Sequence, residues 1–357
     1  MLRLERGSME AYAIILAGGD GERLWPLSTP ELPKQFVTLF GGKPLIKHAA
    51  DRLRGLIPPE RIFVVTADRL VDMTRKALPD IPVENIIGEP FRRDTAAAVA
   101  VACGLVKRSG GGDSIGCILT ADHLMTPAAK FRSTLKAAIK AARMHDAVVT
   151  IGIEPDSPAT RFGYIERGSK ADVPGKVEFF DVKRFVEKPC LKMARRYLKS
   201  GRFYWNSGMF IWKATVLADA FASAAPDFVP LIEKVAASQN IDAFLSREYG
   251  RLRSISFDYA VMEKISGVLV AESSFSWDDV GSWLSLANHF PVGTAGNICL
   301  GDALVHDAAD SIVIGQDGRL TALIGVKDMV VVNTAKATLV CPKSRIHEIR
   351  QLLKNKK

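Results

Sequence analysis

Three glycines and two basic residues near the N-terminus have the types and spacing of a polyphosphate site. The glycines are Gly18, Gly19 and Gly21. They follow residues 11–16, a short apolar run that is typical of a buried strand. Glycines permit a tight turn that points several backbone N–H groups at one anion. Arg23 and Lys34 add two positive charges, so the pattern predicts a triphosphate site in which these side chains hold the β- and γ-phosphates.

Two other glycine motifs fit this segment less well. A Walker loop requires Gly-x-x-x-x-Gly-Lys-Ser/Thr, and the sequence contains no such string. A dinucleotide fingerprint requires a third glycine where this chain has Leu24, and an acidic residue about twenty positions on, where residues 39–43 offer none. A nicotinamide-dependent oxidoreductase is therefore disfavoured.

An aspartate at the end of a second apolar run could bind a metal ion. Asp122 follows residues 114–120, and a carboxylate at the end of a strand would project towards a ligand, as a Mg²⁺ ligand should. The alternative for Asp122 is a helix cap or a turn residue. His123 is next in the chain, but with no second His or Cys nearby a zinc site is not indicated.

Six segments along the chain, the first of which carries two strings, resemble the signature of one enzyme family. They begin with Leu-Ala-Gly-Gly-Asp-Gly-Glu-Arg-Leu-Trp-Pro-Leu and Pro-Lys-Gln within residues 16–35, and continue with Thr-Ala-Asp-His (120–123), Phe-Val-Glu-Lys-Pro (185–189), Trp-Asn-Ser-Gly-Met-Phe (205–210), Asp-Tyr-Ala-Val-Met-Glu-Lys (258–264) and Trp-Asp-Asp-Val-Gly (277–281). In this order they resemble the sugar-phosphate nucleotidyltransferases, specifically the mannose-1-phosphate guanylyltransferases.

The resemblance implies a reaction. GMP would pass from GTP to α-D-mannose 1-phosphate by in-line attack at the α-phosphate with Mg²⁺, giving GDP-mannose and pyrophosphate. The attacking phosphate oxygen is already an anion, so catalysis would consist of positioning and charge neutralisation. The resemblance makes Asp279 the second metal ligand beside Asp122, and leaves Asp278 facing solvent or supporting the metal ligands.

The resemblance also implies the residues that contact the sugar phosphate. Lys188 would contact its phosphate, and Glu187 would accept hydrogen bonds from its hydroxyls. The amide of Asn206 can both donate and accept, which suits vicinal hydroxyls. Gly163 would let the backbone approach the hexose, and Asp258 is a further candidate for the sugar or for the surroundings of the metal.

Recognition of the base is the least determined part of the pattern. Guanine presents N–H donors at N1 and N2 and an acceptor at O6, so a carboxylate facing the donors would reject adenine. By resemblance Glu89 has this role, although a plain loop glutamate is an equally good interpretation. The backbone of Leu16 and Ala17 is also expected to face the base.

Two alternative functions are kept open. One is the same chemistry with another nucleoside triphosphate or hexose 1-phosphate. The other is a non-catalytic homologue that binds sugar nucleotides and regulates. Loss of a charged residue from the phosphate or metal set would favour the second alternative, but all four are present: Arg23, Lys34, Asp122 and Asp279.

Apolar runs alternate with helical patterns in the first half of the chain. Runs such as 61–66 and 147–153 read as buried parallel strands, and 95–107 and 127–144 read as helices between strands. This alternation predicts a Rossmann-like, doubly wound, mostly parallel sheet with ligands at the carboxyl ends of its strands.

The composition and pattern of the sequence change near residue 290, where short runs rich in Val, Ile and Gly begin. We therefore expect a flexible extension at 1–10, a nucleotidyltransferase catalytic domain at 11–290, and a small β-rich domain at 291–357 that ends in a helix.

Composition limits the class of protein. The net charge is +9, but the basic residues are scattered, so we expect small polyphosphate substrates and no nucleic acid. The five cysteines form no Cys-x-x-Cys pair, which is typical of a reducing cytoplasm. The apolar runs are too short to span a membrane. For the oligomeric state, the working hypothesis is a homodimer.

Overall fold

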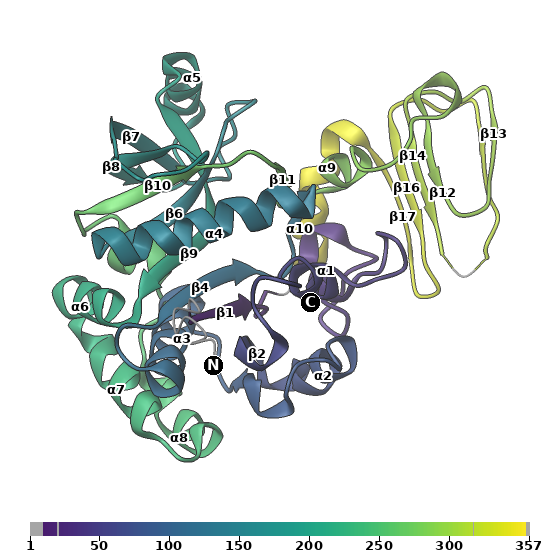
Figure 1. The fold of residues 1–357 in the computed structure, drawn as a ribbon. Coiled ribbons are helices and arrows are strands. Elements are labelled where there is room, and N and C mark those ends of the chain that lie inside the picture. The colour runs from purple at the N-terminus through teal and green to yellow at the C-terminus, as the bar shows by residue number, and fades with distance from the viewer. Residues whose placement is uncertain (1–9, 20, 317, 355–357) are drawn as a thin grey trace, which may run out of the picture. The chain divides into compact units, whose positions relative to one another are not determined.

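The computed structural model describes residues 10–19, 21–316 and 318–354, which form two compact units (Figure 1). Unit 1 comprises the described residues up to Gly18 together with Ala49–Ala121 and Met125–Trp277. Unit 2 comprises Gly19–His48, Asp122–Leu124 and the described residues from Asp278 onwards. The expected extension at 1–10 lies outside the described residues except for Glu10. The expected division at 290/291 stays a prediction, and the compact units follow a different, discontinuous partition.

Unit 1 is built on one large sheet. In the described part of the chain this sheet has nine strands in the order β3-β2-β1-β4-β9-β6-β10-β8-β7. The strands are β1 (Ala11–Leu16), β2 (Ile62–Ala67), β3 (Ile86–Glu89), β4 (Ile115–Thr120), β6 (Val148–Ile153), β7 (Tyr164–Lys170), β8 (Phe179–Val186), β9 (Phe203–Lys213) and β10 (Val268–Glu272). Strands β3, β2, β1 and β4 run parallel, as do β6 and β10. Strand β9 is antiparallel to β4, β6 and β7.

The α/β class expected from the sequence is confirmed. The apolar runs at 11–16, 61–66, 114–120 and 147–153 all form strands of this sheet, shifted by at most one residue. Alternation along the sequence does not indicate that β9 lies between β4 and β6, because pairing partners depend on the path of the chain rather than on local pattern.

Helices cover both faces of the sheet in unit 1. They are α2 (Val71–Ala77), α3 (Asp94–Gly110), α4 (Ala128–His145), α5 (Leu191–Ser200), α6 (Ala214–Ala224), α7 (Val229–Ala237) and α8 (Ile241–Glu248). The alanine-rich α3 packs with α6 and α7 against one face, and α4 packs against β4, β6 and β9 on the other (Figure 1). No helix among the described residues is long and apolar enough to cross a membrane.

Unit 2 has a separate core that joins segments far apart in sequence. Its buried members come from the glycine-loop region and from the C-terminal strands, and include Leu24, Leu27, Val37, Leu45, Trp283, Leu286, Ile312, Val330 and Val332. The Trp283 indole donates to the carbonyl of Trp25 at 3.2 Å. The segment that carries Lys34 is therefore held by the same core as the C-terminal domain.

The C-terminal part of unit 2 winds back and forth between two small sheets, which confirms the expected β-rich domain. One sheet has the order β12-β14-β16-β17, and the other pairs β13 with β15. The elements are β12 (Ile298–Leu300), β13 (Ala303–His306), β14 (Ile312–Gly315), β15 (Thr321–Ile324), β16 (Met329–Asn333), β17 (Thr338–Pro342) and a final helix α10 (Ile349–Lys354). The remaining short elements are α1 (Leu45–Asp51), β5 (Leu124–Thr126), β11 (Ser276–Asp278) and α9 (Trp283–Ala287).

Candidate functional site

Three of the predicted residues meet in unit 2 around a buried ammonium group. Lys34 begins a short 3₁₀ helix, and its side chain is only 8% exposed. Its Nζ donates to Oδ2 of Asp122 at 3.0 Å and to the backbone carbonyl of Asp279. These partners lie 88 and 245 positions away in the chain. The fold thus brings together a predicted phosphate ligand and both predicted metal ligands.

The glycine loop approaches this lysine closely. Gly21 has a φ of +64°, and a Cβ on it would lie 2.3 Å from the Cβ of Lys34. Only glycine fits there, since both the conformation and the space exclude a side chain. Gly19 has open space around its α-carbon, and Arg23 is exposed in the 3₁₀ turn Glu22–Leu24. The loop therefore leaves backbone accessible beside two cations, as expected of a phosphate-binding loop.

The carboxylate of Asp122 is held in its charged form. Burial acts to raise its pKa, but the positive charge of Lys34, with His123 3.6 Å away, holds the pKa below its ordinary value. An ionised carboxylate is a hard oxygen ligand of the kind that Mg²⁺ prefers. Among the described residues no three His, Cys, Asp or Glu side chains gather as a complete metal site. The two aspartates fit Mg²⁺ on that ground, because Mg²⁺ usually takes one or two carboxylates and completes its shell with phosphates and water.

The turn that carries Asp279 is anchored by its neighbour. Oδ1 of Asp278 accepts from the backbone N of Val280 at 2.6 Å, and Oδ2 lies 3.0 Å from Nε2 of His289. Val280 is fully buried with a φ of +45°, which is unusual for a β-branched residue. Both carboxylate oxygens of Asp278 are therefore engaged within the protein. Of the two roles expected for Asp278, this favours support of the turn that carries Asp279 over a side chain that faces solvent. His289 was missed, because no pattern in the sequence links it to Asp278.

A second cluster, in unit 1, collects the residues predicted to bind the sugar phosphate. Nδ2 of Asn206, on β9, donates to Oδ1 of Asp258 at 2.7 Å. Asp258 begins a π-helix, Asp258–Met262. Glu187 and Lys188 follow β8 and form an ion pair with each other. The side chain of Lys188 is 58% exposed and that of Glu187 only 11%. Two carboxylates, an amide and an ammonium group therefore form this cluster, and together they could bind a ligand that carries hydroxyls and a phosphate.

Gly163 lies against this cluster as expected of a close-approach glycine. Its carbonyl accepts from the backbone N of Asn206 at 2.8 Å, and an added Cβ would lie 2.5 Å from Oε2 of Glu187. Any side chain at this position would displace the carboxylate. The same carboxylate disfavours ionisation of Asp258: burial, aided by the negative charge of Glu187, raises the pKa of Asp258 to about 6. Hydroxyl donors from a sugar would relieve this crowding of acceptors.

A third cluster, also in unit 1, surrounds the residue predicted to read the base. Glu89 ends β3 and is partly buried, and its Oε1 accepts a hydrogen bond from the hydroxyl of Tyr249. A Cβ on Gly18 would lie 3.0 Å from its Oε2. Leu16 and Ala17 already use backbone groups within the sheet: the Leu16 carbonyl accepts from Ala121, and the Ala17 N–H donates to Val65. The Ala17 carbonyl also accepts from the hydroxyl of Thr66 at 3.1 Å, and the expected contact of both residues with the base stays a prediction. Sequence reasoning missed Tyr249, which belongs to none of the strings.

Replacing Glu89 with Gln should stabilise the protein in a pH-dependent way. Burial raises the pKa of Glu89 to about 7, although the Tyr249 hydrogen bond acts to lower it. The folded state therefore disfavours the ionised form. This penalty is absent below the unfolded pKa of about 4.5 and complete above pH 7, where it amounts to about 3 kcal/mol. We expect Glu89→Gln to raise the free energy of unfolding at pH 8 and to leave it nearly unchanged at pH 4, below the unfolded pKa, as measured by denaturant titration.

The matched control for this stability measurement is Glu84→Gln, which removes an exposed carboxylate five positions earlier and should change little at either pH. An equal gain for Glu89→Gln at pH 4 and pH 8 would contradict a Glu89 carboxyl group with a raised pKa.

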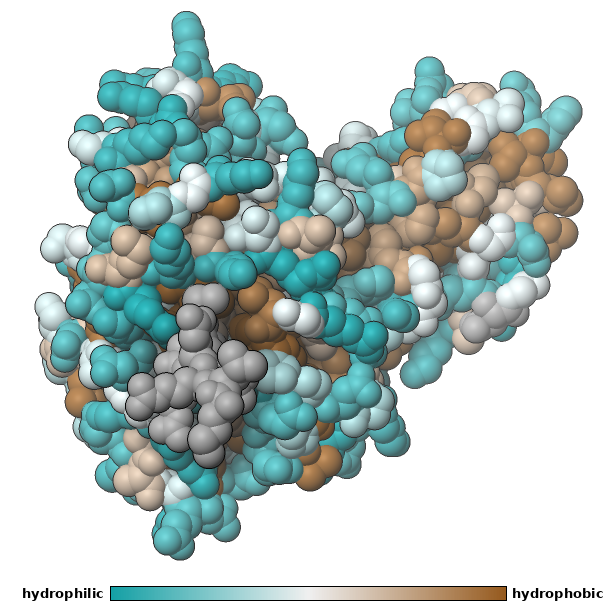
Figure 2. Space-filling model, viewed as in Figure 1, coloured by the Kyte–Doolittle hydropathy of each residue, from teal (hydrophilic) through white to brown (hydrophobic). Residues whose placement is uncertain are grey.

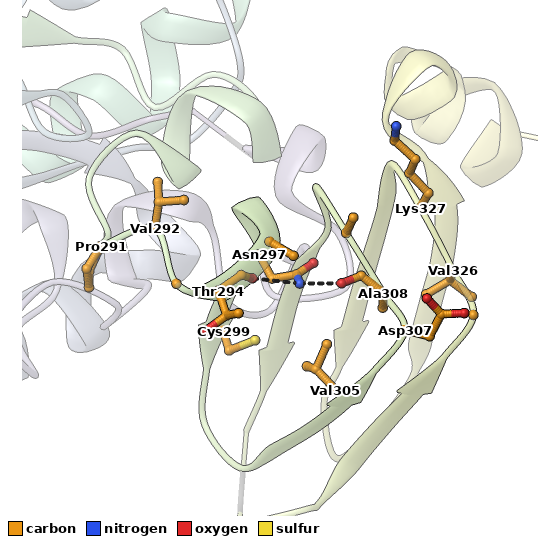
Figure 3. A pocket seen from close by; sticks show the side chains of 14 residues that line it. Pro291, Val292, Thr294, Asn297, Cys299, Val305, Asp307, Ala308, Val326 and Lys327 are labelled. Atoms are coloured by element: carbon orange, nitrogen blue, oxygen red, sulfur yellow. Dashed lines mark hydrogen bonds between the residues drawn. The ribbon is translucent and has the colours of Figure 1, made fainter.

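A pocket of about 880 Å³ lies elsewhere, among the loops of the C-terminal strands in unit 2 (Figure 3). None of the residues predicted from the sequence lines it. Its central amide, Asn297, donates from Nδ2 to the carbonyls of Thr294 and Ala308 at 3.0 and 2.7 Å, and its Oδ1 accepts from the backbone N of Ser311. This amide serves the fold, and the predicted chemistry belongs to the three clusters.

Comparison with known proteins identifies the family of the chain. The model of the nucleotidyl transferase family matches residues 12–295, and that of the "MannoseP isomerase/GMP-like beta-helix domain" matches 301–355. A mannose-1-phosphate guanylyltransferase of Escherichia coli K12 is 35% identical over 96% of this chain and 72% of its own length. The alginate biosynthesis protein AlgA of Pseudomonas aeruginosa is 35% identical over 96% of this chain and 71% of its own.

A solved structure from Thermus thermophilus, described as a mannose-1-phosphate geranyltransferase, has a TM-score of 0.87 and 33% identity. It covers 97% of this chain, which in turn covers 99% of it. The chain belongs to the nucleotidyl transferase family, as its sequence signature predicts, and within it to the group of the mannose-1-phosphate guanylyltransferases. It is accordingly an enzyme, a nucleotidyltransferase.

Proposed function

We propose that this enzyme transfers GMP from GTP to α-D-mannose 1-phosphate, releasing pyrophosphate. The observation that carries the proposal is the arrangement around Lys34, whose ammonium group joins the carboxylate of Asp122 to the backbone of Asp279. A buried cation beside the ionised carboxylate of Asp122 suits phosphoryl transfer, which depends on positioning and charge neutralisation. The names of the similar proteins from Escherichia coli support the choice of substrates.

Each cluster has a role in the proposal. Arg23, Lys34 and the backbone of Gly19 and Gly21 hold the triphosphate, and the third N–H of the Lys34 ammonium meets a phosphate oxygen. Asp122 and Asp279 would hold Mg²⁺, which when bound supplies positive charge to the phosphates. The oxygen of mannose 1-phosphate attacks the α-phosphorus in line, and pyrophosphate leaves.

The residues of unit 1 orient the two substrates in this proposal. Glu89 accepts the N–H donors of guanine. Asn206, Glu187 and Asp258 accept or donate hydrogen bonds at the hydroxyls of mannose, and Lys188 neutralises its phosphate. The nucleophile needs no base, so none of these carboxylates has to remove a proton.

Pyrophosphate release tests the proposal. We expect turnover with Mg²⁺, GTP and mannose 1-phosphate, much lower rates with ATP, UTP or dTTP and with glucose 1-phosphate, and loss of turnover in excess EDTA. Unchanged release in EDTA would contradict the role of the metal. Faster release with another triphosphate or hexose 1-phosphate would instead support the first alternative, the same chemistry on other substrates.

Lys188→Ala should separate the two substrates. A charge-assisted hydrogen bond to phosphate is worth about 1.5–3 kcal/mol, or roughly ten- to a hundredfold. We therefore expect the KM for mannose 1-phosphate to rise by that factor and the KM for GTP to change little, as measured by initial rates. The control is Lys183→Ala, which removes an exposed lysine from β8. A rise in the KM for GTP alone would contradict the assignment of Lys188 to mannose 1-phosphate and would place it at the triphosphate instead.

Location and assembly stay predictions. A cytoplasmic location follows from the cysteine pattern, and all five cysteines are free in the structure. A homodimer would need an apolar surface. Figure 2 shows apolar residues gathered over the C-terminal strands, where Leu304, Leu320 and Ile324 are 59%, 59% and 72% exposed. Surfaces of this kind mark interaction sites in soluble proteins. Measurement of the molar mass in solution would show whether the protein is a monomer or a homodimer.

A further inference from the structure

A buried tyrosine is hydrogen-bonded to the Glu89 carboxyl group. Tyr249 is fully buried, and its hydroxyl donates to Oε1 of Glu89, 160 positions earlier in the chain. The tyrosine opens a short 3₁₀ turn, Tyr249–Arg251, that follows α8, and α8 packs against β3, the strand that ends at Glu89. The contact therefore joins two elements of unit 1 that are already packed together.

The turn that carries Tyr249 is itself held in place. The guanidinium group of Arg93 donates to the carbonyl of Gly250. The ring of Phe91 packs against the same residue, since a Cβ on Gly250 would lie 3.0 Å from it, and the Arg93 guanidinium lies 5.9 Å from the centre of that ring. Both contacts hold Gly250, the residue next to Tyr249, and a positioning residue needs a turn that is fixed in this way.

The second oxygen of Glu89 points elsewhere. Oε2 lies 3.0 Å from the position that a Cβ of Gly18 would occupy, at the carboxyl end of β1 where the glycine loop begins. Ligands of open α/β sheets bind at such strand ends. With Oε1 engaged by Tyr249, Oε2 is the atom directed towards a ligand there.

We propose that Tyr249 is a positioning residue for nucleotide selection: its hydroxyl fixes Glu89 so that Oε2 is presented as an acceptor to the N–H donors of the base. The inference rests on the proposed use of GTP, because it is guanine that carries donors at N1 and N2. Adenine has an acceptor at N1, and hypoxanthine has the N1 donor but lacks the amino group at position 2. Burial of Glu89 makes an unmatched acceptor costly, so a base without donors would be rejected.

Binding of three nucleotides to Tyr249→Phe tests this inference. Phenylalanine keeps the ring and removes the hydroxyl. We expect the Kd for GTP in the presence of Mg²⁺ to rise about tenfold, the Kd for ATP to change less than twofold, and the Kd for ITP to rise by an intermediate factor. The KM for mannose 1-phosphate should not change. Tyr12→Phe is the control, because it removes a hydroxyl from a buried tyrosine at the other end of β1, remote from Gly18.

Glu89→Gln and the double variant test whether Tyr249 acts through Glu89. We expect Glu89→Gln alone to lower selectivity for GTP over ATP at least as much as Tyr249→Phe does. Adding Tyr249→Phe to Glu89→Gln should cost less than a further twofold, since the two side chains form one unit. If Tyr249→Phe does not fold, Glu89→Gln alone still tests the inference. Unchanged selectivity for GTP over ATP in Glu89→Gln would overturn it.

The pH dependence of binding gives an independent readout. The groups around Glu89 are Tyr249, Arg93 beside the 3₁₀ turn, and Asp68, which packs against Gly88. The Tyr249 hydrogen bond acts to lower the pKa of Glu89, so its loss should shift the pH range of GTP binding upwards relative to the unchanged protein. A purely structural effect would weaken binding equally at all pH values.

The outcomes separate this inference from the proposed function. If the unchanged protein does not prefer GTP, the proposed function and this inference both fall. If it prefers GTP and Tyr249→Phe weakens GTP, ITP and ATP by the same factor, or adds its full effect to Glu89→Gln, only the inference is overturned.

Discussion

Asp122→Asn and Asp279→Asn should each lower kcat by about a hundredfold or more. Each substitution keeps the shape of the side chain and removes one negative charge. A ligand without that charge binds Mg²⁺ more weakly. Asp122 is ionised in the folded protein because Lys34 and His123 lie beside it, so asparagine removes a full charge at neutral pH. The measurement is kcat as a function of Mg²⁺ concentration with saturating GTP and mannose 1-phosphate.

The double variant distinguishes a shared ion from two separate effects. Residues that act as a unit give strongly non-additive losses, so Asp122→Asn with Asp279→Asn should fall little below either single variant. Fully multiplicative losses would argue against one shared metal ion. Asp302→Asn, an exposed aspartate of unit 2, is the control and should leave kcat unchanged.

Lys34→Ala should have the second largest effect, about a hundredfold in kcat/KM for GTP. The upper end of the range for a charge-assisted hydrogen bond applies, because the ammonium group is buried rather than screened by water. In the reverse direction, the use of pyrophosphate should weaken similarly, and the KM for mannose 1-phosphate should change least. Lys34→Gln should not restore activity, since glutamine lacks the charge.

Initial rates in both directions provide the measurement for Lys34. Lys336→Ala, an exposed lysine in a turn of unit 2, is the matched control. If Lys34→Ala raised the KM for mannose 1-phosphate and spared GTP, Lys34 would not be a triphosphate ligand. Thermal unfolding of the variant should be recorded as well, because Asp122 loses its buried partner.

The sequence by itself was sufficient for the features that depend on local pattern. A run such as 11–16 predicts a buried strand because apolar, branched residues must leave water wherever they are placed in the chain. The three glycines after this run predict a tight turn, and in the structure Gly21 has a φ of +64°, a conformation that glycine adopts without strain. The order of the strings was enough to identify the family, which the matches to known proteins confirm.

Only the tertiary structure decided which side chains meet. The hydrogen bonds of Lys34 with Asp122 and Asp279, of Asn206 with Asp258 and of Glu89 with Tyr249 all join residues more than fifty positions apart. No periodicity in the sequence reports such pairs, because they depend on the path by which strands and turns are packed. The same holds for the pKa of Glu89, since it is burial by distant elements that raises it. Local pattern therefore determined the elements and the chemistry available, and packing decided the partners that give each charged group its role.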